Sequence, residues 1–165
     1  MSDGDVTSGI LIAGIGNIFL GDDGFGPEVI RHVAPTISDP RIRVVDYGIR
    51  GMHLAYDLLD GWDLLLLVDA VPGRGSPGAV HAFEADLGTV NGATGVDAHA
   101  MDPVAVFASL AALGGHPPHT VVIGCEVADV AEGIGLSGPV AAAVPVAVRT
   151  IQTVVAGRLA TAGQG

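Results

Sequence analysis

The segment that most restricts the fold is residues 63–70, whose sequence DLLLLVDA is apolar at nearly every position between its two aspartates. A strand with one face in water alternates apolar and polar residues, whereas a strand covered on both faces does not. Strands of the second kind are typical of parallel sheets, because the helices that connect parallel strands lie on both faces of the sheet. The run therefore predicts a central strand of a parallel sheet.

The remainder of the chain alternates short β-branched runs with segments of helical period. Further strands are expected at residues 10–14, 41–46, 79–84 and 120–127, and helices at 24–33, 52–59 and 102–115. Residues 138–162 also have helical spacing, and we expect Pro145 to divide them into a short turn and a long terminal helix. This alternation predicts a three-layer α/β fold, with a mostly parallel twisted sheet flanked by helices on both faces.

The length of 165 residues suits one domain, and we expect residues 1–165 to form it, with residues 1–8 and 163–165 as flexible tails. Residues 1–8 lack the basic and apolar regions of a signal peptide. The apolar run at 64–71 is interrupted by Asp69 and is far too short to span a bilayer. We therefore expect a cytoplasmic protein without membrane insertion.

The charge of the chain excludes several functions. Its formal net charge of −11 repels phosphate backbones, so we expect no nucleic-acid partner and favour a protein, a peptide or a cation. All seven basic residues are arginines, and without lysine neither a Walker A loop nor pyridoxal phosphate chemistry is possible. Cys125 is the single cysteine, which excludes an intramolecular disulfide and predicts an inert buried thiol.

Acidic side chains follow the expected strands at the points where the strands end. Asp22 and Asp23 come after the first strand, Asp46 ends the second, and Asp69 ends the third. In sheets of this kind, ligands bind beyond the carboxyl ends of the strands. His99 lies in the loop before the helix expected from residue 102. We therefore expect these acids and His99 to gather along one edge of the sheet.

Each of these residues also has a purely structural explanation. Asp22 or Asp23 would be favourable at a helix N-terminus, where backbone amides are exposed. Asp69 could cap a strand end with backbone partners, and His99 could be an ordinary loop residue. For the other histidines we expect surface or hydrogen-bonded roles in helices and strands at His32, His53 and His81, and a loop at His116 and His119.

Two carboxylates and one imidazole, from Asp23, Asp69 and His99, suit a borderline divalent ion such as zinc or nickel, with ligand distances of about 2.0–2.2 Å. A dinucleotide-binding loop is excluded, because Phe19 stands where its third glycine belongs. A phosphoacceptor receiver domain shares the arrangement of acids but usually carries a lysine after its fifth strand. A receiver-like domain remains an alternative, as does a passive nickel-binding module.

Five motifs in order resemble one known family. They are GIGNIFLGDDGFG at residues 14–26, DYGIRG at 46–51, Asp69 within LLLVDAV, His99 within DAHAMDP, and Gly135-Leu136-Ser137. Together they span about residues 10–160. The chain resembles the hydrogenase maturation endopeptidases, which trim the C-terminus of the [NiFe]-hydrogenase large-subunit precursor.

This resemblance implies roles for particular residues. Asp23, Asp69 and His99 match the family's metal-binding positions, and Asp46 matches a further acid at the catalytic site. The resemblance also implies that the partner is the large-subunit precursor and that it carries nickel, for which zinc or cadmium would substitute in vitro. Two positions depart from the family pattern: many members have glutamate at the position of Asp23, and threonine is frequent where Ile49 stands.

Overall fold

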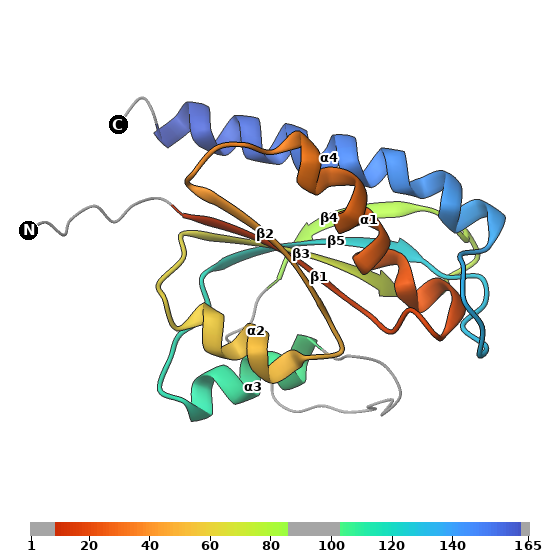
Figure 1. Ribbon diagram of the computed structural model, residues 1–165, viewed down its shortest axis with the longest axis horizontal. Helices are drawn as coiled ribbons and strands as arrows, with labels where there is room; N and C mark the ends of the chain where they lie inside the picture. Colours follow the sequence, from red (N-terminus) through yellow and green to blue (C-terminus); the bar gives the residue numbers. More distant parts are fainter. Residues whose placement is uncertain (1–8, 86–102, 163–165) are drawn as a thin grey trace, which may run out of the picture.

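The computed structural model of the chain describes residues 9–85 and 103–162, which include a five-stranded sheet (Figure 1). Its strands lie in the order β2-β1-β3-β5-β4. They are β1 (Ile10–Ile15), β2 (Ile42–Gly48), β3 (Leu64–Val71), β4 (Val80–Glu84) and β5 (His119–Glu126). Only β4 is antiparallel to its neighbour in this sheet. The predicted mostly parallel sheet is confirmed.

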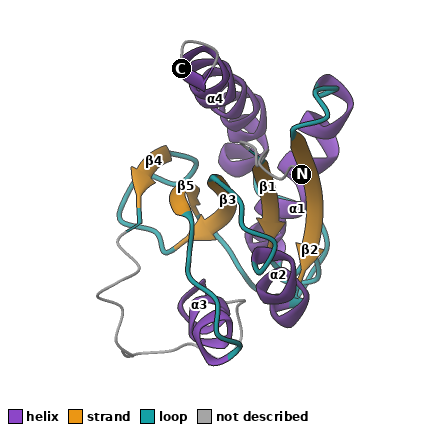
Figure 2. Cartoon of the chain, turned by 90° about the vertical axis from the view of Figure 1, so that its left-hand side faces the viewer, coloured by secondary structure: helices purple, strands orange, loops and turns teal. Residues whose placement is uncertain are grey.

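Helices cover both faces of this sheet (Figure 2). One face carries α1 (Phe25–Val33) and α4 (Gly138–Ala162), and the other carries α2 (Gly51–Leu58) and α3 (Pro103–Ala112). In β3, Leu64, Leu66 and Val68 pack with α1 and α4, while Leu65 and Leu67 pack with α2 and α3. The apolar run is therefore buried on both faces, as predicted.

Helix α4 runs unbroken through Pro145, so the predicted division at this proline is wrong. Proline removes the hydrogen bond to the carbonyl of Ala141 four residues earlier, which destabilises the helix. The residues that bury α4 lie on both sides of Pro145 and belong to one core cluster; they are Val140, Ala143, Val144, Ala147, Ile151 and Val155. Pro145 and Ala141 are themselves exposed, so water can reach the Ala141 carbonyl that loses its partner. The packing of both halves of α4 on the sheet therefore outweighs the lost hydrogen bond.

Within the described residues, the stretch Gly138–Thr161 of α4 is the one helical segment long and apolar enough to cross a membrane. Length and composition alone are weak grounds for a span, because the core helix of a globular domain has the same composition. One side of α4 packs against α1 and the sheet. That packing accounts for its apolar residues.

The parallel strands β1, β2, β3 and β5 all end at the same edge of the sheet, on the right in Figure 1. Four segments leave the strands there, and one of them, residues 72–79, joins β3 to β4. Residues 16–20 lead from β1 into the short 3-10 helix η2 (Gly21–Gly24), residues 49–50 join β2 to α2, and residues 127–137 join β5 to α4. We call this edge the carboxyl edge and residues 127–137 the β5–α4 loop.

Candidate functional site at the carboxyl edge

The turn that carries Asp22 and Asp23 folds back tightly against the end of β1. Gly16 has a φ of 143°, and a Cβ atom at this position would collide with the backbone carbonyl of Asp23. Only glycine fits, both for its φ and for the close approach. The glycine of the opening motif therefore places the two aspartates directly beside the strand end.

Asp23 is a nearly buried carboxylate, and its Oδ2 atom accepts a hydrogen bond from Asn17 N–H over 2.7 Å. Burial raises the pKa of Asp23, and the Asn17 bond only partly opposes this. Asp23 lies in the first turn of η2, as an acid at a helix N-terminus would, but neither η2 nor α1 has a side-chain cap hydrogen bond at its N-cap residue. Its buried negative charge is one that a nearby cation would stabilise.

Asp69 lies at the end of β3 and is 7% exposed. It follows Val68, whose backbone carbonyl packs directly against Gly26 in the first turn of α1. The η2 turn also contacts β3, and β3 is the neighbour of β1 in the sheet. Asp23 and Asp69 therefore stand at adjacent strand ends, which confirms that the fold brings them to one edge.

Asp46 reaches the same edge but lies at its rim. It is paired in register with Gly14 on β1, so β1 separates it from β3. Its exposed carboxylate accepts a hydrogen bond from Gly48 N–H at 2.9 Å, and Arg50 donates to its backbone carbonyl at 2.8 Å. The Asp46 side chain therefore shapes the turn after β2.

Asp22 holds the β5–α4 loop and does not cap a helix. Its fully buried Oδ2 accepts from Ala128 N–H (2.8 Å), Asp129 N–H (3.0 Å) and the Ser137 hydroxyl (2.9 Å), while Oδ1 accepts from Ser137 N–H at 2.7 Å. Burial alone would raise the pKa of Asp22, but these bonds together outweigh it and lower the pKa. Asp22 therefore remains ionised as a structural anchor.

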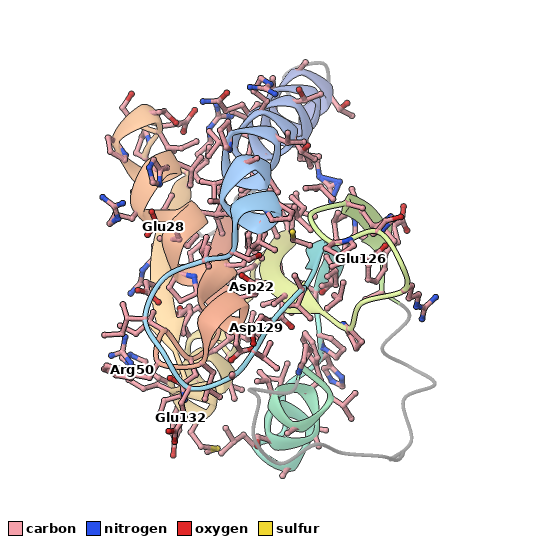
Figure 3. The ribbon with its side chains drawn as sticks, turned by 90° about the vertical axis from the view of Figure 1, so that its right-hand side faces the viewer. Asp22, Glu28, Arg50, Glu126, Asp129 and Glu132 are labelled. Atoms are coloured by element: carbon pink, nitrogen blue, oxygen red, sulfur yellow. The ribbon has the colours of Figure 1, made fainter. Side chains whose placement is uncertain are left out.

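Backbone hydrogen bonds reinforce this anchor. Gly21 N–H donates to the Gly133 carbonyl at 2.9 Å, and Gly133 N–H donates to the Phe19 carbonyl at 2.8 Å. Figure 3 shows the β5–α4 loop crossing in front of the strand ends, with Asp22 behind it and Glu132 on its outer bend. The loop thus forms one wall of the carboxyl edge.

Glu126, at the end of β5, is a buried acid that sequence reasoning missed. It accepts hydrogen bonds from Arg74 N–H (2.8 Å) and Ser76 N–H (3.1 Å), and its Oε2 lies 2.8 Å from His81 Nε2. The His81 bond, followed by the two backbone donors, lowers the pKa of Glu126. An acid after an apolar strand, the signal used for Asp69, would have found it. The hydrogen bonds of Glu126 hold the loop between β3 and β4 against the end of β5.

His99 falls in residues 86–102, outside the described part of the chain, so its predicted place beside Asp23 and Asp69 stays a prediction. In residues 9–85 and 103–162, no group of three histidine, cysteine, aspartate or glutamate side chains could hold a metal ion. Of the predicted ligands, the described residues therefore include the two carboxylates of Asp23 and Asp69, and a third ligand would come from elsewhere.

The remaining predictions for histidine and cysteine are largely confirmed. His32 bonds the Glu28 carbonyl, and His53 lies 3.9 Å from the Asp57 carboxylate. His119 is the first residue of β5, so its expected place in a loop is wrong. Cys125 is fully buried, and burial raises the pKa of its thiol to about 11, which keeps it protonated and inert.

Comparison with known proteins gives one consistent result. Residues 27–154 match the family model described as hydrogenase maturation protease. The hydrogenase expression/formation protein HupD of Rhizobium leguminosarum bv. viciae is 30% identical over 145 residues, which cover 86% of this chain and 71% of HupD. Coenzyme F420 hydrogenase subunit delta of Methanothermobacter thermautotrophicus is 29% identical over 150 residues, with coverages of 86% and 91%.

The fold agrees with a solved structure. The hydrogenase maturating endopeptidase HybD from E. coli superimposes with a TM-score of 0.73 at 22% sequence identity. The match covers 90% of this chain and 93% of HybD. The arrangement of sheet and helices described above is therefore shared with that protein.

Proposed function

This chain belongs to the hydrogenase maturation protease family, and we propose that it removes the C-terminal extension of a [NiFe]-hydrogenase large-subunit precursor after nickel insertion. One observation carries the proposal. Asp23 and Asp69, both nearly buried, stand at the ends of neighbouring strands where such sheets bind their ligands. The receiver-like alternative has no support in the family comparison.

The two carboxylates suit a substrate that brings its own cation. Their oxygens are ligands that a divalent ion accepts, and a cation would offset the burial that penalises the charged form of Asp23. In the proposal, Asp23, Asp69 and His99 bind the nickel of the precursor, whose own cysteine thiolates hold the metal. Processing would then occur only on precursor that contains nickel.

Asp46 has a different part in the proposal. Its carboxylate is exposed and holds the turn at Gly48, next to Ile49, whose side chain is 64% exposed. That turn would lie along the peptide on the rim of the site, with Asp46 within reach of the backbone around the scissile bond. We also place the protein in the cytoplasm, where its single thiol would stay reduced.

The test uses nickel-loaded and nickel-free precursor, each incubated with the protein and analysed by intact mass. The expected result is a shortened precursor only in the nickel-loaded sample. Asp69→Asn keeps the size of the side chain but removes its charge, so processing should collapse while the melting temperature stays near that of the wild type. Full processing by this variant would exclude Asp69 as a ligand, and binding of nickel without cleavage by the wild type would indicate a passive nickel-binding module.

A further inference from the structure

A groove of about 700 Å³ opens between α1, the first half of α4 and residues 134–136 of the β5–α4 loop. The two helices pack side by side, and Glu28 on α1 marks the groove's outer wall in Figure 3. The volume is in the range of pockets that take a ligand of a few hundred daltons. It therefore has room for a few residues of an extended peptide and none for a folded body.

This groove begins at the turn that carries Asp23. Gly21 and Gly24, which flank the two aspartates, both line it. Ile18 and Ile134 also line it and are 48% and 77% exposed. Exposed isoleucines are costly in water, so they favour an apolar partner at this place. A peptide lying in the groove would thus have one end beside the candidate site.

The end of the groove that lies away from the Asp23 turn carries an unpaired positive charge. Among its charged lining residues, Glu28 is paired with Arg31 at 2.6 Å. Arg149 is exposed, and its guanidinium has no hydrogen bond or ion pair within the described residues. The groove therefore has an apolar middle, formed by Leu136, Val144 and Val148, and an unpaired guanidinium at its end. A guanidinium in this position complements a carboxylate.

We propose that the α1–α4 groove binds the C-terminal extension of the precursor, the part that is cut off. Apolar side chains of the extension lie against Val144 and Val148, and a carboxylate, from an acidic side chain or the chain terminus, meets Arg149. A chain end can enter between two helices, which the folded body of the precursor cannot. This inference rests on the proposed function and adds the site that recognises the leaving peptide.

The first test fills the groove with a single side chain. Ala141 and Ala142 are consecutive, exposed residues of α4, but only Ala141 lines the groove. We expect Ala141→Trp to raise KM for nickel-loaded precursor at least about fivefold with little change in kcat, because peptide contacts are lost and the acids are untouched. Ala142→Trp, the matched control, should leave KM unchanged. Equal KM values for the two variants would overturn the proposal.

A second variant pair tests the charge without adding bulk. Arg149→Gln should raise KM severalfold, whereas Arg43→Gln should not, since Arg43 is on β2, away from the groove. A synthetic peptide with the sequence of the extension should inhibit the wild type competitively and Ala141→Trp more weakly. If Ala141→Trp changes the oligomeric state and not KM, the groove is a contact between copies of this chain and the proposal is wrong. Failure of the wild type to cleave would refute the proposed function itself.

Discussion

Asp22 and Asp23 are neighbours in sequence, yet their surroundings push their pKa values in opposite directions. Four hydrogen bonds to Asp22 outweigh its burial and lower its pKa, whereas burial dominates at Asp23 and raises its pKa. Asp22 is therefore a charged anchor for the β5–α4 loop. Within the described residues the Asp23 carboxylate accepts one hydrogen bond while burial raises its pKa, which is the property expected of a residue that receives a cation from a substrate.

We predict that Asp22→Asn lowers the free energy of unfolding by about 2–3 kcal/mol at neutral pH, because the amide nitrogen cannot accept the bonds from Ala128 and Ser137. The lowered pKa means that the unfolded state binds the proton more readily, so this contribution is complete above the unfolded value near 3.8. It is lost as the pH falls through the folded pKa. Urea unfolding between pH 3 and 7 measures both effects.

Asp23→Asn is the matched control for that experiment. Its folded pKa is raised, so removing the charge relieves a burial penalty, and the unfolding midpoint at neutral pH should not fall. Processing of precursor should nevertheless be lost in this variant. A loss of stability in Asp23→Asn equal to that in Asp22→Asn would show that the two roles are wrongly assigned.

At the scale of elements, the opening and closing motifs of the chain meet. Ser137, in the segment before α4, donates two hydrogen bonds to Asp22, in the turn before α1. The same two segments line the groove, and α1 and α4 then pack side by side. The start of α4 is therefore fixed by a buried polar contact, and its length is set by packing along the sheet.

We predict that Pro145→Ala stabilises the protein by about 1–2 kcal/mol. Alanine restores the hydrogen bond to the Ala141 carbonyl, and this gain is partly offset because alanine leaves the unfolded chain more conformational entropy than proline does. The melting temperature should rise by several degrees. Pro139→Ala is the control, since Pro139 is in the first turn of α4, where no intrahelical bond is lost. A lower melting temperature for Pro145→Ala would show that α4 depends on this proline.

At the scale of the whole molecule, the candidate ligands form an incomplete metal site. The described edge supplies two carboxylates and no thiolate, since Cys125 is buried in the core. Even with His99, three ligands on separate segments bind more weakly than a closed four-ligand site. Thiolates of a substrate would supply the affinity for nickel.

We therefore predict that the purified protein contains little stoichiometric metal and that dialysis against a chelator leaves its activity on nickel-loaded precursor unchanged. Metal content is measured by mass spectrometry of the digested protein, and activity by the intact mass of the precursor. The opposite result, in which chelation abolishes cleavage and added zinc restores it on nickel-free precursor, would indicate an ordinary metallopeptidase.

The sequence by itself determined the layered fold and the edge of the sheet at which the candidate site lies. The apolar run ending at Asp69 predicts a central strand, because burial on both faces removes the alternation of apolar and polar residues. Asp23 and Asp69 could be placed together because parallel strands end on one side. These features depend on local pattern and on the direction of strands, which the chain order fixes.

Only the tertiary structure decided which neighbouring acid is the anchor, how far α4 extends and where a groove opens. Asp22 accepts bonds from residues more than a hundred positions away, so no local pattern could distinguish it from Asp23. Pro145 breaks an isolated helix, and it is tolerated here because residues on both sides of it are packed on the sheet. Burial and long-range hydrogen bonds arise only when distant segments meet, and they set the charge of Asp22 and the length of α4.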